Sequence, residues 1–156
     1  MKTFISLSAL FLSLSLTAQT NTATWYLNDA SGNGIQSPLS IASGYNSTAM
    51  GVNTEASGYY SIAMGSLTTA SGMFSTAMGR GTTASDWSSL VMGQFNLSGS
   101  TVTTSATEFS LDNTAFVIGN GVDGDNRSDA LVVKFNGDAT LAGNLNINSD
   151  ARLKSN

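Results

Sequence analysis

The fold is decided by "SGYYSIAMGSLTTA", residues 57–70, because the next fourteen residues, "SGMFSTAMGRGTTA" at 71–84, repeat it with few changes. Two more units of the same length flank this pair, "SGYNSTAMGVNTEA" at 43–56 and "SDWSSLVMGQFNLS" at 85–98. The chain of 156 residues therefore contains four consecutive units with no gap between them. A strict period of this kind identifies a repeat architecture and has to be settled before any single element is assigned.

Four columns of the repeat keep one residue type or a close substitute. Random drift of a low-complexity sequence would not hold methionine, an uncommon residue, in one register, so the period reflects structure. The columns are Ser47, Ser61, Ser75 and Ser89 at the fifth position, Ala49, Ala63, Ala77 and Val91 at the seventh, Met50, Met64, Met78 and Met92 at the eighth, and Gly51, Gly65, Gly79 and Gly93 at the ninth.

The length of the unit indicates strands rather than helices. Helical repeats need roughly 33 to 47 residues, whereas fourteen suit two short strands and two turns. We expect "STAMG" or "SIAMG" to form the first strand and the segment around "TTA" to form the second. Glycine after each strand permits the positive φ of a tight corner. The sequence thus predicts an all-β solenoid whose stacked coils lie about 4.8 Å apart.

The first strand of each unit has apolar residues on both sides. Met64 shares one side with Ile62, and Ala63 points to the other, because successive side chains alternate along a strand. One coil encloses only one of these sides, and strands with apolar residues on both sides are usually buried on both. We therefore expect another copy of the chain to cover the second side. The pattern gives neither the number of copies nor which side faces the partner.

The repeats resemble a known family. "NSTAMGVNTEASG", "SIAMGSLTTASG" and "STAMGRGTTASD" are similar to the head repeats of trimeric autotransporter adhesins (YadA-like heads). The resemblance covers residues 43–98 and resumes at "TAFVIGNG", residues 114–121, where Gly119 takes the place of the ninth-position glycine. It implies a left-handed parallel β-roll and a homotrimer. The fourth unit has Asp86 in place of glycine and Val91 in place of alanine, as expected of an end coil.

Composition excludes several classes of function. The chain carries 6 Lys+Arg against 10 Asp+Glu, for a net charge of −4, which argues against nucleic acid as a partner. It has no His and no Cys, so a disulfide framework, a thiolate nucleophile and a zinc cluster are excluded, and the usual general base is missing. We expect neither a metal nor another cofactor, and no enzymatic activity.

The first residues read as a targeting signal. "MKTFISLSALFLSLSLTAQ" has one lysine, an apolar run and then small residues, which is typical of a secretory signal peptide over residues 1–18. A membrane helix is the alternative, although the run is short and interrupted by serine. No later segment is apolar enough to span a bilayer, so we expect a protein exported to the cell surface or beyond. Residues 19–42 then form a lead-in to the repeats.

The last eight residues carry a second resemblance. "SDARLKSN", residues 149–156, looks like the opening of the endosialidase-type intramolecular chaperone domain of tail spikes. In that family a serine and a lysine form a self-cleaving dyad, and the matching positions are Ser149 and Lys154. Such a stub has nothing to lower the lysine pKa, so no cleavage is expected. A longer reading frame that was cut short would explain the stub, and a chance polar tail is the alternative. Residues 99–148 would form the end coil and a connector rich in β-structure.

Three groups of residues are candidate binding sites. The third-position column, Tyr45, Tyr59, Met73 and Trp87, forms either a ligand-facing stripe, a cap on the coil edge or a contact between chains. Thr54, Thr68 and Thr82 would line up on the outer surface, either as an ice- or mineral-binding ladder or as ordinary strand residues. "GVDGDNRSD", residues 121–129, departs from calcium-loop spacing at Arg127 and reads as a polar turn between strands.

These features favour a structural and adhesive module that contacts cells, matrix or other molecules through its surface. The ligand stays open. Two alternatives remain: the shaft of a tail-spike-like fibre that is trimerised by a C-terminal chaperone, and an ice- or surface-binding solenoid.

Overall fold

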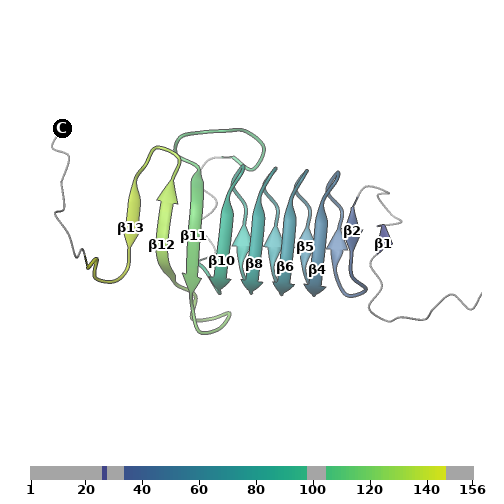
Figure 1. Ribbon diagram of the computed structural model, residues 1–156, viewed down its shortest axis with the longest axis horizontal. Helices are drawn as coiled ribbons and strands as arrows, with labels where there is room; N and C mark the ends of the chain where they lie inside the picture. Colours follow the sequence, from purple (N-terminus) through teal and green to yellow (C-terminus); the bar gives the residue numbers. More distant parts are fainter. Residues whose placement is uncertain (1–25, 28–33, 98–104, 147–156) are drawn as a thin grey trace, which may run out of the picture.

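The computed structural model describes residues 26–27, 34–97 and 105–146, and these form an all-β solenoid (Figure 1). A sheet of nine strands and a sheet of four strands form its two walls. The nine strands, in spatial order, are β1 (Tyr26–Leu27), β2 (Ile35–Gln36), β4 (Thr48–Val52), β6 (Ile62–Ser66), β8 (Thr76–Arg80), β10 (Leu90–Gln94), β11 (Thr114–Asn120), β12 (Asp129–Lys134) and β13 (Ala139–Leu141). The four are β3 (Ile41–Ala42), β5 (Glu55–Ala56), β7 (Thr69–Ala70) and β9 (Thr83–Ala84).

The coils stack in the register that the repeat predicts. β4, β6, β8 and β10 pair in parallel, so that Met50 lies beside Met64 and Met64 beside Met78. β11 continues this ladder, with Gly93 beside Gly119. The expected strands, the period of fourteen and the resumption of the pattern at residue 114 are therefore confirmed.

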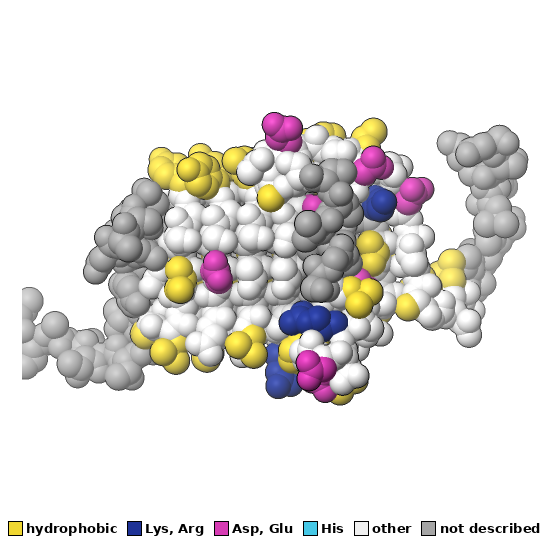
Figure 2. Space-filling model, turned by 180° about the vertical axis from the view of Figure 1, so that it is seen from behind, with side chains coloured by type: hydrophobic (Ala, Val, Ile, Leu, Met, Phe, Trp, Pro, Cys, Tyr) yellow, Lys and Arg dark blue, Asp and Glu magenta, His cyan; other side chains and the backbone are white. Residues whose placement is uncertain are grey.

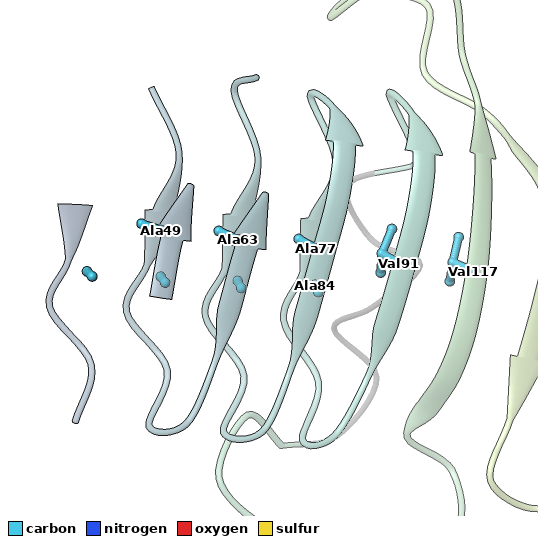
Figure 3. Packing of buried hydrophobic residues seen from close by; sticks show 9 residues of the cluster. Ala49, Ala63, Ala77, Ala84, Val91 and Val117 are labelled. Atoms are coloured by element: carbon cyan, nitrogen blue, oxygen red, sulfur yellow. The ribbon is translucent and has the colours of Figure 1, made fainter. Parts of the chain in front are cut away.

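The interior is filled by very small side chains. Ala49, Ala63 and Ala77 are fully buried between the sheets, together with alanines of the second strand such as Ala84 (Figure 3). The core widens only at the end coil, where Val91 packs beside Val117. The alanine side of the first strand therefore faces inward, and the methionine side faces out.

Buried hydroxyls complete this core. Ser47, Ser61 and Ser89 each donate a hydrogen bond to the carbonyl three residues earlier, as from Ser61 Oγ to Gly58 O at 2.7 Å. Such local bonds satisfy serine hydroxyls that have no water around them. The core is thus a column of alanine and serine, which keeps the two sheets close together.

The expected outer threonine ladder is wrong. Thr54, Thr68 and Thr82 are buried, with at most 1% of each residue exposed. The cause is the residue before each of them, since Asn53 and Leu67 have φ of 54° and 58°. This left-handed residue turns the chain inward, so the following threonine enters the core. The ice-binding hypothesis is therefore not supported, because it required these threonines to be exposed.

Glycines act in two different ways at the corners. Gly65 and Gly79 have φ of 119° and 114°, as expected for a tight corner. Gly58 of the Ser-Gly turn lies outside the left-handed region, and a Cβ there would overlap the carbonyl oxygen of Gly72 in the next coil. Its role is close stacking of the coils. The left-handed residues of this turn are Tyr60 and, in the next coil, Phe74, although the sequence pattern predicted glycine in that conformation.

Asp86 marks the last regular coil, as predicted. It occupies the position of Gly58 and Gly72, and its Oδ2 accepts a hydrogen bond from Thr114 N at 2.8 Å. The carboxylate thereby fixes the start of β11. β12 pairs antiparallel with β11, and β13 pairs antiparallel with β12. These two strands extend past the four-stranded sheet, with Gly137 (φ 94°) in the turn between them (Figure 1).

Candidate functional site

The outer face of the nine-stranded sheet is a broad apolar surface, here called the methionine face. Its side chains alternate with the buried alanines and valines, and they are half-buried or exposed; Ile62, for example, is 37% exposed. Two neighbouring rows run across the strands. One contains Met50, Met64, Met78, Met92, Ile118 and Leu131, and the other contains Thr48, Ile62, Thr76, Leu90, Phe116 and Val133.

A row of aromatic side chains occupies the corner where the first strands begin. Tyr45 and Tyr59 are exposed by 45% and 55%, whereas Met73 and Trp87 of the same column are half-buried. Tyr45 contacts Tyr59 with ring centroids 6.2 Å apart. In Figure 2, hydrophobic side chains gather along the corresponding upper edge, over the N-terminal coils.

The aromatic row is longer than the column that the sequence indicated. Tyr60 and Phe74, the left-handed residues of the turns, stack with an interplanar angle of 6° and a centroid distance of 5.0 Å. Phe74 contacts Trp87, and Phe109 and Phe135 continue the row at 5.4 and 5.2 Å. The repeat gave no signal for Phe109 and Phe135, because they come from outside it. Tyr60 and Phe74 were visible as aromatic neighbours of the predicted column.

The segment 105–113 lies against this corner. Ser105 O accepts a hydrogen bond from Trp87 N at 3.0 Å, and Ala106 O accepts one from Met73 N at 2.7 Å. Successive residues of the segment therefore lie beside third-position residues of successive coils, Ser105 beside Trp87 and Ala106 beside Met73. A hydrogen bond within the segment, from Asn113 Nδ2 to Glu108 O at 2.9 Å, stabilises its conformation.

A pocket of about 330 Å³ opens where this segment meets the column. Tyr59 and Met73 belong to the third-position column, and Thr107 comes from the segment 105–113. The lining residues are Ser57, Gly58, Tyr59, Ser71, Met73 and Thr107. Two of the four predicted binding residues therefore line one pocket, while Tyr45 and Trp87 lie elsewhere in the row.

The opposite corner carries two arginines around one ring. Arg80 and Arg127 lie over Phe95, with guanidinium carbons 5.1 and 5.6 Å from its centroid. Arg127 Nη1 also donates to Gly81 O at 2.9 Å and to Asn96 O at 3.2 Å. The side chain therefore ties the β11–β12 turn to the end of the solenoid.

The segment 121–129 is the turn between β11 and β12, as predicted. Asp123 Oδ1 accepts hydrogen bonds from Asn126 N at 2.8 Å and Asp125 N at 3.0 Å. The bond from Asn126 is the main cause that lowers the pKa of Asp123 below its usual value. Asp129 points elsewhere, and its Oδ1 accepts from Leu97 N at 3.0 Å. Within the described ranges no group of three or more acidic residues comes together as in a metal site.

Several predictions fall outside the described residues. The signal peptide over 1–18 and the dyad Ser149 and Lys154 both lie there, so they stay predictions. In the part of the chain that is described, no helix has the length and apolar character needed to cross a membrane.

The stacked coils agree with a known family model. Residues 42–94 match the YadA head domain repeat. The model describes two copies of the repeat, and it matches in three overlapping windows, 42–68, 56–82 and 70–94. The matched region is about a third of the chain and coincides with the in-register coils. No curated protein and no solved structure matches the chain.

Proposed function

We propose that this chain is an adhesive head module that acts as a homotrimer at the cell surface. The observation that carries the proposal is the match of the stacked coils to the YadA head repeat over residues 42–94. The proposed role is structural and adhesive rather than catalytic. Export through the N-terminal signal is part of the same proposal.

The methionine face supports assembly of several copies. Its two apolar rows cross the solenoid and continue over β11 and β12, where Phe116, Ile118 and Leu131 remain half-buried. Exposed apolar patches of this extent are typical of protein interfaces. Methionine adapts its shape to a partner, which suits a surface shared between copies.

The aromatic row supports attachment. It places rings from successive coils along one edge of the solenoid. Aromatic side chains supply large contact areas with little loss of conformational entropy and dominate many binding surfaces. In this proposal Tyr45 and Tyr59, the most exposed members of their column, contact the ligand directly.

An attachment assay tests the proposal. Beads coated with the full chain, and with the Tyr45→Ser, Tyr59→Ser double variant, are applied to cells and to matrix-coated surfaces. We expect the double variant to lose most of the attachment that the unmodified chain shows, because two exposed rings are removed. Val52→Ser is the matched control, since Val52 is 48% exposed at the opposite corner.

Two results would contradict the adhesive role. Beads that never attach, although the coated protein is folded, would favour the fibre shaft instead. Attachment that is equal for the unmodified chain and the double variant would remove the aromatic row as the contact surface.

A further inference from the structure

We infer that the pocket beside Tyr59 binds a neutral sugar residue. The inference rests on the proposed adhesive function and adds the chemical class of its ligand. A volume of about 330 Å³ lies at the lower end of the range for ligand pockets, about 300–1,000 Å³, and suits one or two sugar rings.

One wall of the pocket is flat and apolar. Tyr59 is 55% exposed, and within the described residues its only ring neighbour is Tyr45, tilted by 50°. Met73 continues this wall from the next coil. Sugars present one face of C–H groups, which packs on an aromatic ring as other apolar groups do.

The rest of the pocket offers hydroxyl groups. Ser57, Ser71 and Thr107 line it, and among the described residues none of their hydroxyls has a hydrogen-bond partner. Each hydroxyl both donates and accepts, which is what the hydroxyl edge of a sugar requires. The pocket therefore combines an apolar platform with adaptable polar groups on the other sides.

A free backbone donor lies at the same place. The amides of Trp87 and Met73 donate to Ser105 and Ala106, whereas the amide of Tyr59, one coil further along, has no partner within the described residues. A ligand oxygen in the pocket would accept a hydrogen bond from the Tyr59 amide, as the carbonyls of Ser105 and Ala106 do from the amides of Trp87 and Met73.

The charges select neutral ligands. The lining contains no Asp, Glu, Lys, Arg or His, and Glu108 directly follows Thr107. A carboxylate-bearing or sulfated sugar would find no cation among the lining residues to pair with its charge. Proline-rich peptides fit less well, because they dock between parallel aromatic walls, whereas Tyr60 and Phe74 stack directly on each other and leave no slot.

The test uses the full chain and a panel of methyl glycosides of glucose, galactose and mannose with their disaccharides. Saturation-transfer NMR identifies binders, and titration gives their affinity. We expect Tyr59→Ser to weaken binding at least about tenfold, and Tyr59→Phe to keep it within about threefold, because the ring provides the platform. Thr107→Val removes one hydroxyl at nearly constant shape and is expected to weaken binding about fivefold.

Val52→Ser is the matched control, since Val52 is 48% exposed at the opposite corner and does not line the pocket. Circular dichroism and solution mass confirm that each variant is folded. The inference is overturned if no neutral glycoside binds the folded chain at millimolar concentration, if sialyllactose binds more tightly than lactose, or if Tyr59→Ser binds as well as the unmodified chain.

The bead assay separates this inference from the proposed function. If attachment depends on Tyr59 but free glycosides neither bind nor compete, the adhesive role stands and the sugar is wrong. Competition by a proline-rich peptide instead would identify a protein ligand and overturn the sugar. Binding of glycosides without any attachment would contradict the adhesive role alone.

Discussion

At the scale of residues, each coil contains two positions with φ between 41° and 61°, besides the positive-φ glycine at its ninth position. Ordinary side chains occupy most of these two positions. In the column 53, 67, 81 and 95, Asn53 and Gly81 suit this conformation, whereas Leu67 (φ 58°) and Phe95 (φ 41°) do not. The Phe95 ring packs over Gly81 of the preceding coil, and this contact offsets part of the backbone strain at Phe95.

Leu67→Asn is expected to raise the free energy of unfolding by about 0.5–1 kcal/mol, because asparagine tolerates the left-handed region better than leucine. Leu67 is 50% exposed, so little burial is lost. Urea denaturation at a fixed protein concentration measures the change. The reciprocal variant Asn53→Leu should lower stability by a similar amount. A loss of stability in Leu67→Asn would mean that the leucine side chain contributes more than the strain it imposes.

At the scale of elements, two segments outside the repeat close the end of the solenoid. The segment 105–113 follows the aromatic corner, and the β11–β12 turn lies against the opposite corner. Asp86 and Arg127 provide the main polar links. End coils need such caps, because otherwise the last coil would leave backbone groups and core residues open to solvent.

Arg127→Ala is expected to cost about 1–3 kcal/mol, since it removes three hydrogen bonds from a charged donor, to Gly81 O, Asn96 O and Gly124 O. The effect should be local. Ser128 N and Gly121 N donate to Phe95 O and Gln94 O at 3.0 and 3.1 Å, and their amide hydrogen exchange should accelerate while that of Ala63 stays unchanged. Arg80→Ala is the control, because the Arg80 guanidinium lies over the same ring without a side-chain hydrogen bond in the described residues. Unchanged exchange at Gly121 in Arg127→Ala would show that the turn is held by other contacts.

At the scale of the whole molecule, the solenoid has one apolar wall and one polar wall. The outward residues of the four-stranded sheet are Ile41, Glu55, Thr69 and Thr83. In Figure 2 most of this face is neither hydrophobic nor charged. The methionine face lies on the opposite wall. The contrast favours assembly through the nine-stranded sheet.

The unmodified chain is expected to have three times its own mass in light scattering after size exclusion. Met64→Asp should shift it to the monomer, because three carboxylates would be buried near one another without partners. Thr69→Asp, the same change to aspartate on the outer face of the four-stranded sheet, should leave the mass unchanged. A folded monomer of the unmodified chain would refute the trimer.

The periodic sequence by itself determined the architecture. The spacing of methionine, glycine and alanine gave the coil length, the two strands and the parallel register, since identical units that stack in parallel must place like residues side by side. It also placed the end coil at Asp86 and Val91, and the turn at 121–129. These features depend on local geometry and on a repeating pattern, which a single sequence displays directly.

Only the tertiary structure decided which side of each strand faces inward. The left-handed residues at 53 and 67 send the threonines into the core, and the alternation that follows puts alanine inside and methionine outside. The alternation of side chains is the same whether the alanine side or the methionine side faces inward, so it does not determine the orientation of the strand. Likewise, the pocket joins Tyr59 to Thr107, and the aromatic row joins Trp87 to Phe109. Such contacts between the repeat and a later segment depend on how the chain returns, and no periodic signal encodes that path.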